Sequence, residues 1–189
     1  MKKSFNAKTL IYPTPVWLIG TYDKSGKPNA ATIAWGGVCS SKPPCAAVSL
    51  RAATYTHGNI MERKAFTINV PSAAQVGIAD YCGFVSGRNV DKFAAAKITA
   101  VKSEKVDAPY IQEFPMILEC KLLSTSEIGI HTHFIGEIID VKIDESMLGK
   151  DGLPDILKIN PILYGPEIQS YYSVGKYLGK AFSIGKELK

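Results

Sequence analysis

The sequence predicts a mainly β fold in which a few short helices are inserted among antiparallel strands. Short apolar runs rich in β-branched and aromatic residues recur along the 189-residue chain, and clusters of turn-forming residues separate them. The segments with helical periodicity are too few to cover both faces of a parallel sheet, so antiparallel strands are expected. The length fits a single domain that spans residues 1–189.

The predicted strands begin with a hairpin. Val16–Tyr22 and Asn29–Trp35 are β-type runs on either side of the turn-forming segment Asp23–Pro28. Two more strands, short and mostly apolar, are predicted at Ala46–Leu50 and Ala65–Val70. The N-terminal part of the chain is therefore expected to form a β-sheet.

Short helices are predicted where local capping and spacing signals occur. Thr56–Arg63 is one candidate, between two of the strands. The strongest signal is the capping box Ser72-Ala73-Ala74-Gln75, in which the Ser and Gln side chains satisfy free backbone amides. It predicts a helix from about Ala73 to Cys82 that is stopped by Gly83. A further short helix is predicted at Asp91–Ala96.

The C-terminal half returns to β patterning. Ile117–Ser124 and His133–Ile143 carry polar residues between apolar ones and are predicted to be strands. Residues 160–189 are rich in Tyr and Gly and are predicted to form an ordered C-terminal tail of the same domain that packs on another surface.

The composition excludes several classes of function. The chain carries 22 Lys and Arg against 17 Asp and Glu, and this excess of positive charge is dispersed. Because no basic run with interleaved aromatic residues occurs, no nucleic-acid partner is expected, and a small anionic ligand suits the charge better. No apolar run approaches the roughly 20 residues of a membrane span, so no membrane partner is expected. The N-terminal lysines precede no apolar region, which predicts a cytoplasmic protein without a signal peptide.

A candidate phosphate site lies where one strand is predicted to lead into a helix. The segment Ser49-Leu50-Arg51-Ala52-Ala53-Thr54-Tyr55-Thr56 supplies a fixed cation, two hydroxyls and a helix N-terminus. These groups are the ones that a phosphate monoester needs. A plain helix cap at Thr56 and a surface arginine at position 51 would produce the same pattern.

A candidate metal site lies on a later strand. Alternation along a strand places His131 and His133 on one face, and Glu137 follows at a spacing that resembles the first metal motif of cupins. A cupin would supply another histidine downstream, whereas the one other histidine, His57, lies upstream. A non-flavin metal enzyme of cupin type that uses His131, His133 and Glu137 is therefore the alternative function.

The order and spacing of several motifs carry a family resemblance. They are Asn29-Ala30-Ala31-Thr32-Ile33-Ala34-Trp35, Ser49-Leu50-Arg51 with Thr54 and Thr56, Ala65-Phe66-Thr67-Ile68-Asn69-Val70, Asp80-Tyr81-Cys82-Gly83 through Ser86-Gly87-Arg88 to Asp91-Lys92-Phe93, and His131 with Phe134-Ile135-Gly136-Glu137-Ile138. In this combination the chain resembles the flavin reductase family, and within it flavoredoxin-like proteins. The resemblance runs from about Tyr12 to Phe182.

The resemblance implies an FMN-binding split β-barrel that forms a homodimer, to which the Tyr-rich tail is expected to contribute. It implies that Arg51, Thr54 and Thr56 hold the FMN phosphate and that residues 29–35 line the isoalloxazine ring. The cofactor-binding residues implied in this way are Asn29, Ala30, Ala31, Thr32, Ile33, Ala34, Trp35, Ser49, Leu50, Arg51, Thr54, Thr56, Asn69 and Lys92. No metal ligand is implied.

The expected function is that of an FMN-binding redox flavoprotein. It is either an NAD(P)H-dependent flavin reductase or a flavoredoxin-like electron carrier. Both remain open because the sequence has no dinucleotide fingerprint that would distinguish the two. The electron donor is thus NAD(P)H or a redox protein, and the acceptor is a flavin or a redox protein. His131 takes the position of a histidine near the nicotinamide in the reductases and is the expected catalytic residue.

Overall fold

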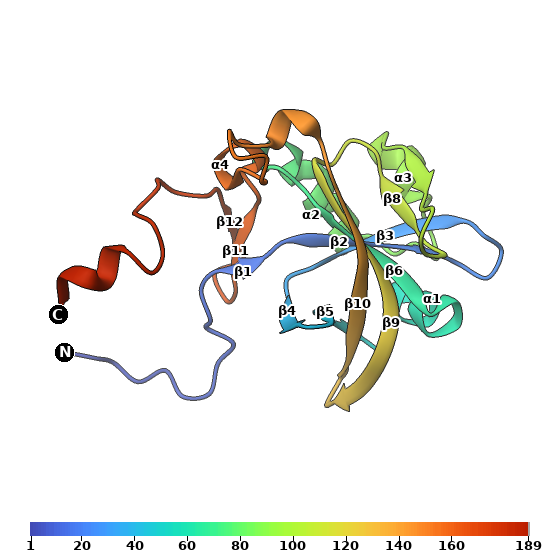
Figure 1. Ribbon diagram of the computed structural model, residues 1–189. Coiled ribbons are helices and arrows are strands. Elements are labelled where there is room, and N and C mark those ends of the chain that lie inside the picture. Colours follow the sequence, from blue (N-terminus) through green and yellow to red (C-terminus); the bar gives the residue numbers. More distant parts are fainter. Residues whose placement is uncertain (189) are drawn as a thin grey trace.

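The computed structural model describes residues 1–188 and consists mainly of β-strands (Figure 1). Its main body is a seven-stranded sheet in the order β3-β2-β6-β9-β10-β5-β4, with every neighbouring pair antiparallel. The Ser49 amide donates to the Trp35 carbonyl at 2.9 Å, which extends the pairing of β4 and β5 by one residue beyond Gly36. The strands are β2 (Trp17–Tyr22), β3 (Pro28–Ile33), β4 (Gly36–Ser41), β5 (Pro44–Arg51), β6 (Ala65–Val70), β9 (Met116–Ile128) and β10 (His131–Ile143).

Two small sheets and several short helices surround this body (Figure 1). The small sheets are β1 (Thr14–Pro15) with β11 (Leu163–Gly165) and β12 (Ser170–Tyr172), and β7 (Ala100–Lys102) with β8 (Pro109–Ile111). The helices are α1 (Tyr55–Arg63), α2 (Val76–Phe84), α3 (Lys92–Ala96) and α4 (Ile156–Ile159), with 3-10 turns at Ala73–Gln75, Glu145–Met147 and Ile184–Leu188. Within residues 1–188, no helix has the length and apolar character of a membrane span.

The predicted mainly β architecture is confirmed. The first hairpin pairs β2 with β3 in a register that places Trp17 opposite Ile33. β6 has the predicted bounds, and all of its residues are buried, which accounts for its continuous apolar pattern. Residues Ala34 and Trp35 lie beyond the end of β3, although the sequence pattern included them in the strand.

The predicted capping box is present, but Gly83 does not stop the helix. The Ser72 amide donates to the Gln75 side-chain oxygen at 2.7 Å, a 3-10 turn follows, and α2 then continues to Phe84. Gly83 faces β3, where an added Cβ would lie 3.4 Å from the Thr32 Cβ. We attribute the continuation to packing of α2 on β3, which offsets the roughly 1 kcal/mol that glycine costs inside a helix.

The core has two parts because successive residues of a strand face opposite sides. On β2, Ile19 joins a cluster that includes Phe66 and Phe134. Its neighbour Leu18 joins a second cluster that includes Phe93, beneath α2 and α3. The second cluster fixes the helices against the first hairpin.

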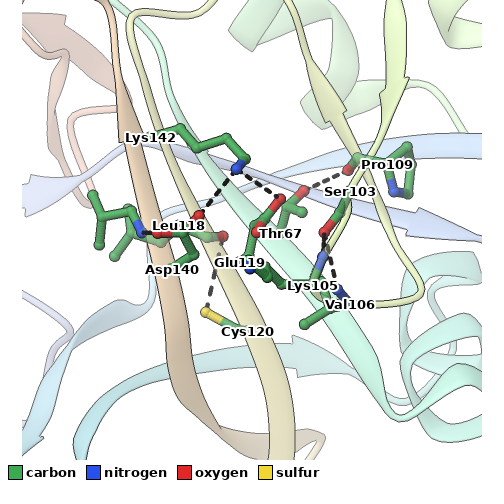
Figure 2. A network of polar contacts seen from close by, with 11 residues as sticks. Thr67, Ser103, Lys105, Val106, Pro109, Leu118, Glu119, Cys120, Asp140 and Lys142 are labelled. Carbon is green, nitrogen blue, oxygen red and sulfur yellow. Dashed lines mark hydrogen bonds and ion pairs between the residues drawn. The ribbon is translucent and has the colours of Figure 1, made fainter.

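A buried carboxylate interrupts this apolar interior (Figure 2). Glu119 on β9 is fully buried, and its register partners are Thr67 on β6 and Asp140 on β10. Neither carboxylate oxygen of Glu119 has a hydrogen-bond partner among residues 1–188. The Lys142 ammonium lies 3.8 Å from Glu119 and 3.0 Å from Asp140. Its hydrogen bond with Asp140 raises the pKa of Lys142. The Lys142 ammonium therefore forms ion pairs with both carboxylates.

Candidate functional site

A cavity of about 570 Å³ opens where β3 and β5 end and where α1 and α3 begin. This volume is within the range of small-molecule sites. Most of the predicted site residues share this cavity, although they come from distant parts of the sequence. The lining residues are Ala31, Thr32, Ile33, Ala34, Trp35, Ser49, Leu50, Arg51, Ala53, Thr54, Tyr55, Thr56, Cys82, Gly83, Phe84, Val85, Ser86, Gly87, Arg88, Lys92 and His131.

One end of the cavity offers a cation and a helix N-terminus. Thr54 caps α1, because its hydroxyl oxygen accepts from the His57 amide at 3.3 Å. The same hydroxyl donates to the Arg51 carbonyl at 2.9 Å, which ties the end of β5 to the start of the helix. Among residues 1–188, no carboxylate forms an ion pair with the Arg51 guanidinium. An unpaired arginine beside free helix amides is suited to an anion.

At this end of the cavity, a hydrogen bond from the buried Asn29 orients the Thr56 hydroxyl. Its oxygen accepts from Asn29 Nδ2 at 2.9 Å, so the hydroxyl proton remains available to a ligand. Asn29 is buried and does not line the cavity, and its Oδ1 has no hydrogen-bond partner in the described part of the chain. Asn29 therefore supports Thr56 instead of facing the ligand itself.

A second cation, Lys92, lies deeper in the cavity. Its ammonium is buried and donates to the carbonyls of Ala30 at 2.8 Å and Cys82 at 2.7 Å. Burial lowers the pKa of Lys92, and none of the ion pairs in residues 1–188 includes it. Because an ammonium has three donors, one remains for a ligand atom.

A second cavity of about 550 Å³ lies directly beside the first. Both cavities are lined by Thr32, Ile33, Ala34, Trp35, Arg51, Gly83 and Phe84. The far wall of the second cavity contains Tyr164, Pro166, Glu167, Gln169 and Tyr171, from β11, β12 and the turn between them. The strand end at residues 32–35 is thus a shared wall, with space on both sides.

His131 begins β10 and lies opposite Arg51 in the register, where it lines the first cavity. The other two histidines have separate partners. His133 Nδ1 lies 2.8 Å from the Ser49 hydroxyl, and His57 Nε2 lies 2.9 Å from the Thr132 hydroxyl. Burial lowers the pKa of His57.

The cupin-type alternative is wrong. His133 is engaged with Ser49, and Glu137 lies farther along β10, opposite Cys45. Within residues 1–188, no group of three or more His, Cys, Asp and Glu side chains is arranged to hold a metal ion. An H-x-H pair on a strand face needs a third ligand from elsewhere in the fold, and the topology brings none to it.

Besides Asn29, two of the expected cofactor-binding residues do not reach the cavity. Ala30 is buried behind it and contributes a carbonyl to Lys92. Asn69 is fully buried in the body, where its Nδ2 donates to the Leu18 carbonyl at 2.9 Å and its Oδ1 accepts from the Ile111 amide at 2.7 Å. Its side chain joins β2, β6 and β8 and so acts on the fold.

Sequence reasoning assigned no role to Arg88, which lines the same cavity. Its guanidinium donates to the Ala53 carbonyl at 2.9 Å and lies 5.7 Å from the centre of the Tyr55 ring. The neighbouring Gly87 packs so closely that an added Cβ would collide with Asn29 Oδ1. The motif Ser86-Gly87-Arg88 was the available signal, because a small residue beside a cation is typical of an anion-binding turn.

Asp23 holds the Tyr55 side of the site in place. Its carboxylate accepts from the Tyr55 hydroxyl at 2.7 Å, and from the Ser25 hydroxyl and the Lys27 amide at 2.7 and 2.9 Å. These bonds, the Ser25 hydroxyl foremost, lower the pKa of Asp23 below its usual range. The bond to Asp23 in turn raises the pKa of Tyr55.

Asp23→Asn is expected to lower the free energy of unfolding at pH 7 by about 1–3 kcal/mol, because bonds to a charged acceptor are lost. A carboxyl with a lowered pKa stabilises the fold above its unfolded pKa of about 4, and this contribution disappears as the pH falls through the folded value. Urea unfolding should therefore show that the difference in free energy of unfolding between the native protein and Asp23→Asn is smaller at pH 3 than at pH 7. Asp144→Asn is the control, since Asp144 is exposed and its side chain caps no helix. A difference in free energy of unfolding between these two proteins that is equal at both pH values contradicts the prediction.

Comparison with known proteins identifies the family. Residues 9–167 match the family described as Flavin reductase like domain. The chain belongs to this family. The flavoredoxin of Desulfovibrio vulgaris (Miyazaki F) is 57% identical with a TM-score of 0.95, covering 98% of this chain and 100% of that one. The flavoredoxin from Methanosarcina acetivorans is 36% identical with a TM-score of 0.93, and the match covers 100% of both chains.

Two further matches are informative. A Shewanella frigidimarina protein described as having a split barrel domain has a TM-score of 0.82 at 24% identity, covering 91% of this chain and 87% of that one, which shows the shared split-barrel fold. A high molecular weight rubredoxin of Moorella thermoacetica is 27% identical over 150 residues, which are 78% of this chain and 59% of the relative. The chain is thus a flavin-binding redox protein with a split β-barrel.

The residues of the site fit the flavin that the family implies. The first cavity joins an anion-binding end at Arg51 and α1 to a strand end with small side chains at residues 31–34, which a planar ring can approach. The buried Lys92 ammonium has a free donor for a polar ring atom. The dimensions and the donor set therefore agree with a flavin.

Proposed function

We propose that this protein binds FMN and exchanges electrons with another redox protein. The observation that carries the choice of FMN is the position of Arg51 at the N-terminus of α1 and at one end of the cavity, where none of the ion pairs in the described part of the chain includes it. Riboflavin has no group that would use these donors, whereas the phosphate of FMN would. Arg51, Thr56 and the first amides of α1 would hold the phosphate, and Thr54 would fix the helix that presents them.

The remainder of the cavity would hold the isoalloxazine ring. Residues Ala31–Trp35 would face the ring with backbone groups and the Trp35 side chain, and Lys92 would donate to a polar ring atom. When bound, FMN supplies the electron- and hydride-transfer chemistry that amino-acid side chains lack. The protein's residues orient the ring, exclude competing reactants and set the charge around it.

A redox protein is the proposed electron donor. The similarity to two flavoredoxins and to a high molecular weight rubredoxin supports this choice. NAD(P)H is the second candidate, because His131 lines the cavity at a position where it could orient a nicotinamide. The proposed acceptor is a second redox protein or a free flavin.

The cofactor is tested by the purified protein itself. We expect it to take up one FMN per chain and to show the absorbance bands of an oxidised flavin. The released cofactor, identified by chromatography and mass, should be FMN and not riboflavin or FAD. A protein that remains colourless after incubation with FMN contradicts the proposal.

His131→Ala separates the two electron donors. With a protein donor, NADH and NADPH should reduce the bound flavin slowly in anaerobic stopped-flow experiments, and the substitution should change this rate little. FMN affinity should also remain nearly unchanged. If the native protein is instead reduced rapidly and the variant is about 100-fold slower, His131 orients a nicotinamide and the protein is an NAD(P)H-dependent reductase.

The assembly is proposed to be a homodimer. The tail is rich in Tyr, which is enriched in interface cores, and its apolar side chains are among the most exposed in the described chain. Sedimentation of the FMN-bound protein at micromolar concentration should give twice the chain mass.

A further inference from the structure

His133 is the histidine beside the flavin site that the proposed function leaves without a role. His131 lines the first cavity itself, and His57 is bonded to the Thr132 hydroxyl. His133 lines neither the first nor the second cavity, but its Nδ1 lies 2.8 Å from the hydroxyl of Ser49, which lines the first. His133 is therefore connected to this cavity through a single hydroxyl group.

The sheet places Ser49 and His133 side by side. They are direct partners in the register of β5 and β10. The Ser49 amide points away from β10 and donates to the Trp35 carbonyl at 2.9 Å, so Ser49 and His133 form a non-hydrogen-bonded pair. Side chains lie closest in such pairs, because the Cα atoms are about 4.5 Å apart and not about 5.5 Å. The bond to Trp35 also places Ser49 beside the wall that would face the flavin ring.

The Ser49–His133 bond has the groups that proton transfer needs. A hydroxyl both donates and accepts, and a neutral imidazole carries its proton on either ring nitrogen. Within residues 1–188, each of the two side chains has the other as its one hydrogen-bond partner. The Ser49 hydroxyl therefore has bonding capacity left for a ligand in the cavity. His133 is half-buried, so part of its side chain remains in contact with water.

No carboxylate holds the His133 ring in its charged form. Across residues 1–188, none of the ion pairs includes His133. The charged or titratable neighbours on its face are His131 on β10 and Arg51 on β5. Glu127 lies on the opposite face of β9, where it opposes the lowering of the His57 pKa by burial. The residues that β9 contributes to the His133 face are Ser124, Ser126 and Ile128, none of which carries a charge.

We propose that Ser49 and His133 form a relay that carries a proton from water to an acceptor in the first cavity. The Ser49 hydroxyl gives its proton to the acceptor and takes the proton of His133 Nδ1, while His133 Nε2 takes a proton from a solvent acid. One proton enters the cavity, no electron moves within the relay, and the ring returns to its first tautomer by exchange with water.

The relay rests on the proposed function and adds the source of the proton to it. A redox protein delivers electrons without protons, whereas a hydride donor delivers both electrons of a reduction together with a hydrogen nucleus. A flavin that is reduced by a protein therefore needs a separate route for protons. A hydroxyl within hydrogen-bond reach of the ligand, backed by an imidazole, is suited to this task.

Reduction by dithionite tests the relay, because dithionite also supplies electrons without a hydride. In anaerobic stopped-flow experiments on the FMN-loaded protein, His133→Gln should be reduced about 100-fold more slowly than the native protein. Added imidazole should restore part of the rate. The native rate should fall in D₂O and depend on pH between about 6 and 8, and both dependences should weaken in the variant. FMN affinity should remain nearly unchanged.

Two serines on either side of His133 provide a matched comparison. Ser49→Ala should be reduced as slowly as His133→Gln, and imidazole should not restore its rate. Ser126→Ala should behave as the native protein, because Ser126 also lies opposite His133 but is exposed and outside the cavity. Reduction of His133→Gln at the native rate, or a slow rate that imidazole does not restore, overturns the relay.

Nitrogen NMR tests the bond itself in the flavin-free protein. The neutral His133 ring should carry its proton on Nδ1 and donate to Ser49, so Ser49→Ala should change the Nδ1 chemical shift and leave that of His57 unchanged. A His133 spectrum that is the same with and without the Ser49 hydroxyl overturns the relay. A protein that binds FMN but is reduced equally fast without His133 contradicts the relay alone, whereas a protein that takes up no FMN contradicts the proposed function and the relay with it.

Discussion

Replacing Arg51 by alanine is expected to weaken FMN binding by about 10- to 100-fold and to leave riboflavin binding nearly unchanged. The guanidinium has no ion-pair partner among residues 1–188, so its donors are free for a phosphate. Hydrogen bonds to charged groups contribute about 1.5–3 kcal/mol, which corresponds to this range of dissociation constants. Riboflavin carries no phosphate and would lose none of these bonds.

Quenching of flavin fluorescence measures both affinities in the same buffer. Arg51→Lys is the matched control, because it keeps the charge but loses the planar fork, and it should fall between the native protein and Arg51→Ala. Raising the salt concentration should weaken the binding of FMN more than the binding of riboflavin in the native protein. In Arg51→Ala, the effects of salt on the two ligands should differ less. Equal losses for both ligands would remove Arg51 from the phosphate site.

Replacing Lys142 by methionine is expected to lower the free energy of unfolding by about 3–5 kcal/mol. Lys142 is the cation beside the fully buried Glu119, whose carboxylate oxygens have no hydrogen-bond partner in the described chain (Figure 2). Removing the ammonium leaves a buried charge without compensation, which costs more than the pair itself contributes. For a chain of this size the melting temperature should fall by about 10 °C or more.

A control variant and a double variant test whether Lys142→Met loses stability because Glu119 is left without its cation or because any lysine on this sheet has been removed. Lys121→Met is the control, because Lys121 is exposed on the same strand as Glu119 and forms no ion pair among residues 1–188. This control should change stability by less than about 0.5 kcal/mol. In the double variant Lys142→Met/Glu119→Gln, the charge is absent and much of the stability should return. A single Lys142→Met variant as stable as the Lys121→Met control would show that Glu119 needs no cation.

Local features of this protein were readable from its sequence. The first hairpin, the bounds of β6 and the capping box at Ser72 depend on residues that are close together along the chain, and each has its own turn or capping signal. The segment from Ser49 to Thr56 was recognised for the same reason. One strand end and one helix start supply its cation, its hydroxyls and its free amides.

Only the tertiary structure decided which residues share the site. Lys92 reaches the cavity because α3 packs beside β3, and Asn29 is withdrawn from it because the side chain bonds to Thr56. Asn69 was expected at the cofactor but joins three strands in the core, and Glu119, on a strand with alternating polar residues, is fully buried. The physical reason is that a polar residue on a strand has the same local pattern whether its face meets water, a ligand or another layer. Contacts between segments that are distant in sequence determine which of these it meets, and no local signal encodes them.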